Sequence, residues 1–245
     1  MALEDQQAVI RYRQSAAAQS ASQKGASLDA EWLKALVMEC GADDAGFVAI
    51  TREELQPQLG KLTKLMPQVK TLVSICCRMN RTAVQSTTRS IANHEFHETY
   101  DEVNHVARKL VRSLTDEGYD AMNAVAAFPM EMQNAPGDTI PIHHKPIAEA
   151  AGIGKMGLHR NVIHPKYGNF ILLDTVLIAH EVTEQSAALD YSPCIDCKLC
   201  VSACPVEAIG MDGSFNFSAC YAHNYRDFMA GWADWVDQVV EAKDR

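Results

Sequence analysis

Cys194-Ile-Asp-Cys197-Lys-Leu-Cys200-Val-Ser-Ala-Cys204-Pro205 carries four cysteines at the spacing C-x2-C-x2-C-x3-C-P. This spacing is typical of segments that hold a cubane iron–sulfur cluster, because the two-residue intervals let three thiolates converge on three corners. The alternative is a structural zinc site, in which two C-x2-C pairs are usually separated by a longer insert. The third cysteine at the same short interval, with Pro205 after the fourth, favours the iron–sulfur cluster.

The composition is that of a globular protein of 245 residues, with 47% hydrophobic and 22% charged residues. No apolar run approaches the length of a membrane span, and residues 1–24 lack the apolar core of a secretory signal. We therefore expect a cytoplasmic protein, in which cysteines stay reduced and available to metal. The formal net charge of −9 argues against nucleic acid as a partner, although Arg78 and Arg81 lie close enough in sequence to form a local basic patch or an ordinary solvated face.

Hydrophobic periodicity predicts strands alternating with helices, and hence a layered α/β or α+β fold. Strands are expected at residues 45–50, 71–77, 120–127 and 169–179. Helices are expected at residues 28–40, with Ser27 as the cap and Gly41 at the end, and at 97–118, 147–151 and 220–240. The expected domains are a polar tail or loose helix (1–26), an α/β domain (27–185) and a small ferredoxin-like module (190–245).

A second signature precedes the cysteines, where residues 145–170 have the sequence KPIAEAAGIGKMGLHRNVIHPKYGNF. Glycines at positions 152, 154, 157 and 168 allow close backbone approach to a flat ligand or positive φ angles. Glycine content alone favours simple tight turns between a helix and a strand, because no phosphate-loop pattern is present.

Taken together, the two signatures resemble epoxyqueuosine reductases and reductive dehalogenases. In those families the pattern P-(L/I)-A-E-x-A-G-(L/I)-G-x-x-G-x-(N/H), then P-x-(Y/F)-G, precedes a ferredoxin-like cysteine run, as residues 146–168 precede Cys194 here. The resemblance implies a nitroreductase-like domain that binds cobalamin base-off, with no protein histidine on cobalt. It assigns cobalamin contacts to Ala151, Gly152, Ile153, Gly154, Gly157, Leu158, Asn161, His164, Pro165, Tyr167, Gly168 and Phe170.

The resemblance also points to a proton donor. Asp138, in the segment Asp-Thr-Ile-Pro, matches the position of the aspartate taken as the donor in epoxyqueuosine reductases. A turn-forming aspartate after Gly137 is the ordinary alternative. His143 and His144 are the second choice for donor, and hydrogen-bonding loop histidines are their ordinary explanation.

The cysteine count departs from the family pattern of eight cluster ligands. Cys220 matches the fifth ligand, but no cysteine follows it. Three explanations stay open: one cluster closed by Cys204 or Cys220, a partner chain that completes a second cluster, or a contribution from Cys40, Cys76 and Cys77. The last is disfavoured because neighbouring strand residues such as Cys76 and Cys77 point to opposite faces of a sheet.

The function predicted from this resemblance is a cobalamin-dependent iron–sulfur reductase that removes oxygen or halogen from a small organic substrate through Co(I). The alternatives are an electron-transfer or corrinoid-binding module without catalysis, an epoxyqueuosine reductase acting on tRNA, and a flavin-binding relative. The expected cofactors are one or two 4Fe–4S clusters and cobalamin. The expected partners are the small substrate and a low-potential donor of ferredoxin or flavodoxin type, with no membrane, with nucleic acid disfavoured as a partner, and with a homodimer as one oligomeric state.

Overall fold

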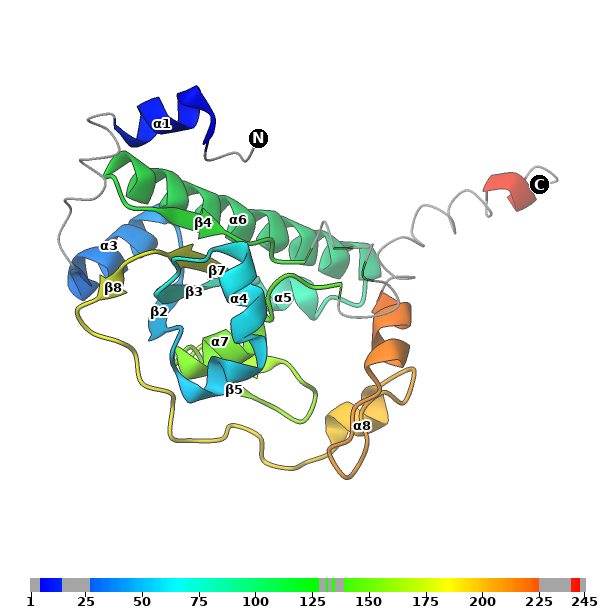
Figure 1. Ribbon diagram of the computed structural model, residues 1–245. Helices are drawn as coiled ribbons and strands as arrows, with labels where there is room; N and C mark the ends of the chain where they lie inside the picture. The colour runs from blue at the N-terminus through cyan, green and yellow to red at the C-terminus, as the bar shows by residue number, and fades with distance from the viewer. Residues whose placement is uncertain are drawn as a thin grey trace. The chain divides into compact units, whose positions relative to one another are not determined.

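The computed structural model describes residues 5–14, 27–127, 131, 134, 139–224 and 239–242 (Figure 1). The chain divides into two compact units, one from residues 1–155 and 162–191 and the other from residues 156–161 and 192–245. Residues 156–161 group with the cysteine-bearing unit, although they precede it by about thirty positions in the sequence. Within the described ranges, no helix is long and apolar enough to cross a membrane.

A four-stranded sheet forms the centre of the first unit. In spatial order its strands are β2 (Asp44–Ala49), β3 (Thr71–Arg78), β7 (Ile171–Ile178) and β4 (Ala121–Asn123). Every neighbouring pair is antiparallel, and Ser74 of β3 lies opposite Thr175 of β7. The fold is therefore of the α+β kind, with strands and helices predicted at nearly the right places.

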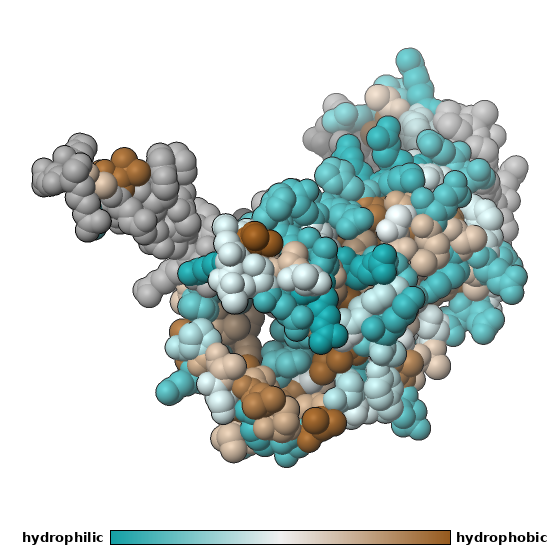
Figure 2. Space-filling view, turned by 180° about the vertical axis from the view of Figure 1, so that it is seen from behind, coloured by the Kyte–Doolittle hydropathy of each residue, from teal (hydrophilic) through white to brown (hydrophobic). Residues whose placement is uncertain are grey.

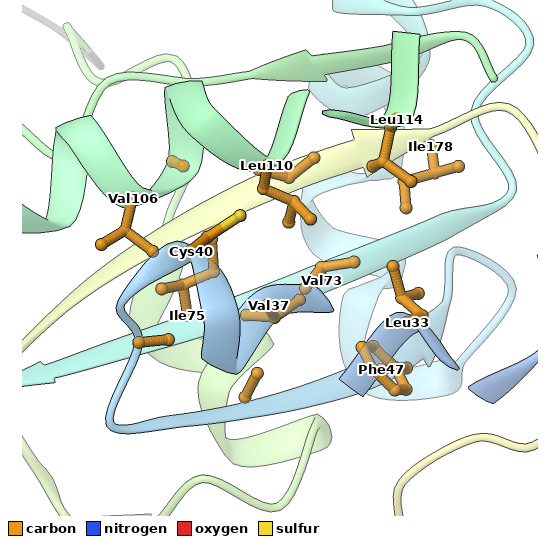
Figure 3. Packing of buried hydrophobic residues seen from close by; sticks show 14 of the residues in the cluster. Leu33, Val37, Cys40, Phe47, Val73, Ile75, Val106, Leu110, Leu114 and Ile178 are labelled. Atoms are coloured by element: carbon orange, nitrogen blue, oxygen red, sulfur yellow. The ribbon is translucent and has the colours of Figure 1, made fainter. Parts of the chain in front are cut away.

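Helices cover both faces of this sheet, as Figure 1 shows. On one face lie α3 (Ala30–Cys40) and the long α6 (Arg89–Asp116), whose apolar residues pack against Phe47, Val73 and Ile75 (Figure 3). On the other face lie η2 (Glu53–Gln58), α4 (Leu59–Leu65) and α7 (His144–Ala150). Because both faces are covered, β3 is buried along nearly its whole length, as predicted.

The start of α3 corrects one prediction. Ser27 does not cap the helix, because Ser27 and Leu28 form β1 (Ser27–Leu28) and pair in parallel with β8 (Glu181–Val182). The cap is Asp29, whose Oδ1 accepts a hydrogen bond from the Trp32 backbone N–H at 2.7 Å. Gly41 ends the helix at φ 116°, as expected.

Other predicted boundaries shift. The long helix α6 begins at Arg89 rather than at residue 97, and β4 has only 3 residues. The short helix α1 (Gln7–Arg13) lies in the stretch 1–26 for which a tail or loose helix was expected, whereas α5 (Arg81–Val84) was not predicted. Residues 217–224 and 239–241 of the predicted C-terminal helix are helical, and residues 225–238 lie outside the described ranges.

A strap of residues 183–187 runs along the outer edge of β2. The backbone N–H of Ser186 donates to the carbonyl of Phe47 at 2.8 Å, and the Phe47 N–H donates to Ser186 Oγ at 2.9 Å. The Ala49 N–H donates to Gln185 Oε1 at 3.2 Å. The strap thus occupies backbone groups that an edge strand would otherwise leave unpaired.

The second unit consists mainly of loops and short elements. It contains α8 (Leu199–Ala203), an isolated antiparallel bridge between Ile209 and Phe215, and the helix at residues 217–224. Residues 156–161 reach it from the first unit as the tip of a hairpin between β5 (Lys155–Met156) and β6 (Val162–Ile163).

Candidate functional site

The cysteine run forms a tight loop that leads into α8. Asp196 and Lys198, which alternate with cysteines, take left-handed backbone angles of φ 55° and 57°. Cys194, Cys200 and Cys204 are half-buried, Cys197 is exposed, and all are free thiols. Most residues between the thiols are exposed and none of the four thiols is fully buried, so the cysteine side chains are accessible to a ligand.

Backbone N–H groups favour the thiolate form of two of these cysteines. The Ala208 N–H donates to Cys204 Sγ at 3.2 Å, and bonds from Val206 and Ala208 lower the pKa of Cys204. The N–H groups of Leu158 and Asp196 lower the pKa of Cys194. Thiolates are the ligands that iron–sulfur clusters require, so this donor set fits such a cluster.

The hairpin tip at residues 156–161 lies in the same unit as the cysteine run and contacts the turn at residues 210–214. Arg160 Nη2 donates to the carbonyl of Gly213 at 2.7 Å, and its guanidinium lies 5.9 Å from the ring centre of Phe215. Lys198, inside the cysteine loop, donates from Nζ to the carbonyl of Met211 at 3.0 Å. Two basic side chains therefore hold the turn at residues 210–214.

The remaining cysteines separate into two groups. Cys220 lies half-buried on the helix at residues 217–224, and Asn224 Nδ2 approaches its sulfur at 3.6 Å. Cys40 and Cys77 lie in the core under α3 and α6, whereas Cys76 lies in the core on the other face. The prediction that Cys76 and Cys77 point apart is confirmed. No three His, Cys, Asp or Glu side chains of the described residues gather closely enough to hold a single metal ion.

The glycines of residues 145–170 have different environments. A Cβ at Gly152 would lie 2.4 Å from the Ala187 carbonyl oxygen, and one at Gly154 would lie 2.6 Å from that of Ile163. At Gly168, where φ is 64°, a Cβ would meet only Phe170, at 3.8 Å. Gly152 and Gly154 are therefore needed for packing within the chain, while the backbone around Gly168 is open to a flat ligand.

Both ring nitrogens of His164 form hydrogen bonds within the protein. Its Nδ1 accepts the backbone N–H groups of Lys166 at 3.0 Å and Tyr167 at 3.3 Å, so Nε2 carries the proton that is donated to Asp44 Oδ2 at 3.0 Å. The ring is buried and stacks on Tyr167 with 4.6 Å between centroids. The sequence alone did not single out Asp44.

A basic–aromatic patch lies beside this turn and consists of Arg78, Arg81, Lys166, Tyr167 and Phe170. The Arg78 guanidinium is 5.8 Å and Lys166 Nζ is 5.1 Å from the centre of the Tyr167 ring, and the Arg81 guanidinium is 5.4 Å from that of Phe170. All three cations are exposed. The patch joins two residues of the predicted cobalamin segment to the basic pair noted in the sequence.

The three predicted proton donors differ in their surroundings. Asp138 lies outside the described residues. His143 is half-buried; its backbone N–H donates to Gln58 Oε1 at 3.1 Å and its carbonyl accepts from Gln58 Nε2 at 3.2 Å. Lys61 Nζ lies 3.3 Å from His143 Nε2, which must therefore act as the acceptor because an ammonium only donates.

His144 instead lies in the core. Its Nε2 donates to the carbonyl of Val125 at 3.0 Å and its Nδ1 accepts from Thr175 Oγ1 at 2.9 Å. Burial lowers the pKa of His144 to about 4, so the ring is neutral at pH 7. A ring with both nitrogens engaged inside the protein is better suited to positioning α7 than to giving a proton to substrate.

Beside His144 lies a buried carboxyl that sequence reasoning did not select. Asp174 is fully buried, its Oδ1 accepts the Thr175 N–H at 2.7 Å, and its Oδ2 has no hydrogen-bond partner. Burial raises the pKa of Asp174 to about 8. The available signal was an acidic residue within the apolar run of residues 170–178.

A shallow groove lies elsewhere on the first unit, between α3, β2 and the strap. Lys34, Phe47 and Ser186 are among its lining residues, and none of the predicted site residues lines it.

The cysteine segment matches a known family model: residues 187–210 match that of the 4Fe-4S binding domain. Among curated proteins, the chain is 34% identical over 83 residues to an epoxyqueuosine reductase of Staphylococcus aureus, covering 34% of this chain and 21% of that protein. It is 36% identical over 72 residues to one from a Synechococcus strain, covering 29% and 22%. The matches thus span about a fifth of the length of these relatives.

Solved structures share the fold. Epoxyqueuosine reductase from Streptococcus thermophilus matches with a TM-score of 0.53 and 20% identity over 76% of this chain and 54% of that one. A catabolic reductive dehalogenase in complex with 3-bromo-4-hydroxybenzoic acid matches with a TM-score of 0.57 and 16% identity over 74% and 25%. These findings confirm the predicted resemblance, the fold class and the 4Fe–4S segment.

One comparison bears on the expected partners. An epoxyqueuosine reductase solved with an epoxyqueuosine-modified tRNA stem loop matches with a TM-score of 0.54 and 21% identity over 76% of this chain and 54% of that one. A protein of this fold therefore binds RNA. The net charge of −9 disfavours nucleic acid as the main partner of this chain, but net charge does not describe local patches, and a tRNA substrate stands among the expected alternatives.

Proposed function

We propose that this chain is a cobalamin-dependent iron–sulfur oxidoreductase that acts on an epoxyqueuosine-type nucleoside in tRNA. The observation that carries the proposal is the glycine-rich segment 145–170 followed by the cysteine run 194–205, in a chain whose sequence and fold are similar in part to those of epoxyqueuosine reductases. The proposal takes the alternative substrate of the sequence analysis as its main one, because the curated relatives bear that name.

The chemistry divides between cofactors and protein. Cobalamin, when bound, supplies a strongly reducing and nucleophilic metal centre. Cys194, Cys197, Cys200 and Cys204 would hold the cluster, which would supply electrons taken from a low-potential donor of ferredoxin or flavodoxin type. Removal of an epoxide oxygen consumes two electrons and two protons and releases water. In this scheme Asp138 gives a proton to the substrate, and His143 is the second choice.

The turn at residues 164–170 is the part of the proposed corrinoid contact with the most support. Tyr167 and Phe170 are half-buried, and the backbone at Gly168 is open to close approach. His164 has both nitrogens bonded within the protein, so it has no lone pair for cobalt. This agrees with a corrinoid bound without a protein histidine ligand.

The basic–aromatic patch supports an RNA substrate. Guanidinium groups held over aromatic rings match the phosphates and the flat bases of a nucleic acid. Arg78 also pairs with Asp43 at 3.0 Å, so Arg81 and Lys166 are the less committed cations. A small set of such contacts gives an affinity that falls as salt rises.

A small oxygenated or halogenated organic molecule is the second candidate substrate. The net charge of −9 favours it, since most of the surface repels a polyanion. It shares the cofactors and the proton donor with the first candidate, so substrate assays distinguish the two.

The test is anaerobic reconstitution of the whole chain with iron, sulfide and cobalamin, followed by assay with a low-potential reductant. We expect brown cluster absorption, corrinoid bound in proportion to protein, about four irons per cluster, and conversion of epoxyqueuosine in tRNA. Asp138→Asn should keep both cofactors and lose turnover. A protein that binds zinc in place of iron and sulfide, or never retains cobalamin, contradicts the proposal.

Matched variants sharpen this experiment. Cys200→Ser should lose the cluster, whereas Cys77→Ala, in the core, should keep it. Arg81→Ala should weaken tRNA binding and flatten its salt dependence, while Arg112→Ala, on the exposed side of α6, should do neither. Turnover of halogenated aromatics with no activity on tRNA selects the second candidate. A cluster without either activity indicates an electron-transfer module.

A further inference from the structure

Arg160 occupies a strained position at the tip of the β5–β6 hairpin. Its φ of 61° lies in the left-handed region, which costs a non-glycine residue about 1–2 kcal/mol. Such a conformation persists where surrounding contacts fix it, and residues with such backbone angles are found more often at functional sites than elsewhere. Here the backbone N–H of Arg160 donates to the Gly157 carbonyl at 2.9 Å within the hairpin turn, and the side chain adds the 2.7 Å hydrogen bond to Gly213 and the contact with the Phe215 ring.

A series of backbone contacts connects the turn that Arg160 binds at Gly213 with the thiol of Cys204. The turn that begins at Gly210 is closed by its N–H, which donates to the Ser214 carbonyl at 2.8 Å. The Ile209–Phe215 bridge follows, and then the Asn216 N–H donates to the Ala208 carbonyl at 2.8 Å. The N–H of the same Ala208 donates to Cys204 Sγ at 3.2 Å.

The hairpin tip also reaches a thiol directly. The backbone N–H of Leu158, two residues before Arg160, donates to Cys194. A Cβ added to Gly213 would lie 3.7 Å from Leu158 Cδ1, so the tip and the turn are in packing distance. Arg160 thus joins the two loops whose N–H groups serve Cys194 and Cys204.

We propose that Arg160 is a positioning residue for the iron–sulfur cluster, which holds the N–H groups of Leu158 and Ala208 on the thiolates and thereby raises the reduction potential of the cluster. The inference rests on the proposed function, because it takes the cysteine run to bind a cluster. N–H donors stabilise negative charge on sulfur, and the reduced cluster carries one more negative charge than the oxidised one. Hydrogen bonds to the sulfurs are among the factors that set these potentials.

The experiment is a redox titration of the anaerobically reconstituted whole chain without substrate, followed by the electron paramagnetic resonance of the reduced cluster. Arg160→Ala should shift the midpoint to more negative potential with the iron content unchanged. Resonance Raman spectra should show a smaller shift of the Fe–S(Cys) stretching bands in D2O, since fewer exchangeable N–H groups bond to sulfur. Arg112→Ala, an exposed arginine of the first unit, should change neither value.

Ionic strength separates positioning from simple charge loss. Arg160 is exposed, so its direct Coulomb effect on the cluster is screened at high salt. We expect the potential difference between wild type and Arg160→Ala to persist from low to high salt. A difference that disappears at high salt overturns the positioning role.

A second variant tests the inference even if Arg160→Ala fails to take up a cluster. Phe215→Leu removes the ring under the guanidinium but keeps an apolar side chain, and it should shift the midpoint in the same direction by less. Wild-type potentials and Raman shifts in variants with a full cluster overturn the inference alone. A wild-type chain that takes up no iron and sulfide overturns the proposed function as well.

Discussion

Oδ2 of Asp44 accepts a hydrogen bond from Nε2 of His164 at 3.0 Å, which ties β2 to the turn that follows β6. Lys34 Nζ lies 2.6 Å from the other oxygen of the same carboxylate. Burial alone would raise the pKa of Asp44, but the hydrogen bonds from His164 and Lys34 outweigh it and hold the pKa far below its usual range. The pair fixes the turn that carries Tyr167 and Gly168.

The first prediction concerns this pair. His164→Ala removes a buried ring and three hydrogen bonds, and should lower the free energy of unfolding by about 2–4 kcal/mol. Because the folded pKa of Asp44 is depressed, its stabilisation is fully present above the unfolded pKa of about 4 and is lost progressively as pH falls from there towards the folded pKa. Asp44→Asn should therefore lower stability at pH 7 and flatten the loss below pH 4.

Urea unfolding at pH 7 and at pH 3.5 measures both effects. Asp101→Asn, on the exposed surface of α6, is the matched control and should leave both values close to wild type. If Asp44→Asn followed the wild-type acid profile, the ion pair would not be the source of the pH dependence.

The second prediction separates packing from ligand binding at the glycines. Gly152→Ala forces a Cβ against the Ala187 carbonyl and a side chain into positive φ, so it should destabilise the protein by about 2–4 kcal/mol without cobalamin present. Gly60→Ala, in α4 with no atom within 4 Å of the added Cβ, should be neutral or stabilising by up to about 1 kcal/mol. Thermal unfolding of the cofactor-free protein tests this. A stable Gly152→Ala variant that fails only to bind cobalamin would show that ligand contact, and not packing, explains this glycine.

The third prediction concerns the buried carboxyl. A folded pKa near 8 means that Asp174 stays protonated in the native state while it ionises in the unfolded chain above about pH 4. At Asp174 the native state therefore binds more protons, and the contribution of this group to stability falls as pH rises from about 4 to 8, by at most about 1.4 kcal/mol per pH unit. Below about pH 6.5 the lowered pKa of His144 contributes the opposite slope, so the quantity of interest is the difference between wild type and Asp174→Asn. Asp174→Asn should remove the slope that Asp174 contributes with little loss at pH 5, because an amide resembles the neutral acid in shape.

Urea unfolding midpoints of wild type and Asp174→Asn, measured between pH 5 and pH 8, test this pH dependence. Thr175→Val is a useful companion, because it removes the hydroxyl that donates to His144 while it keeps the carboxyl. It should lower stability at every pH and leave the slope. Equal slopes in wild type and Asp174→Asn would show that Asp174 is ionised in the folded protein.

The fourth prediction concerns the support of His143. Gln58 is 4% exposed and makes two hydrogen bonds to the backbone of His143. Gln58→Ala should lower the free energy of unfolding by about 1–3 kcal/mol. If His143 contributes to proton transfer, the same variant should lower kcat by a larger factor than the factor by which it changes KM. Thr63→Ala, on the exposed side of α4, should affect neither. Unchanged kcat in a correctly folded Gln58→Ala variant would leave Asp138 as the single proposed donor.

Patterns within short stretches of sequence predicted the cluster segment, the family resemblance and the central strand. The cysteine spacing, the glycine-rich segment and the buried run of β3 were each contained in a short piece of sequence. They gave the cluster segment, the family resemblance and the central strand, because ligand spacing and strand periodicity are properties of neighbouring residues.

The remaining features depend on contacts between distant parts of the chain. Ser27 looked like a helix cap, but pairing with β8 placed it in a strand, and Thr183 Oγ1, 153 positions from Ala30, receives that residue's N–H. Asp44 and His164 are 120 positions apart. The role of Arg160 likewise appears only when Gly213 is brought to it. No periodicity within a single window reveals such pairs.

The strap along β2 has a consequence for solution behaviour. An open edge strand is a template on which a second molecule adds its own strand, and this is a common route to aggregation and amyloid-type assembly. With Ser186 and Gln185 bonded to Phe47 and Ala49, that template is already filled by the chain itself. Loosening residues 183–187 would therefore convert an ordinary surface into a site of intermolecular β-sheet growth.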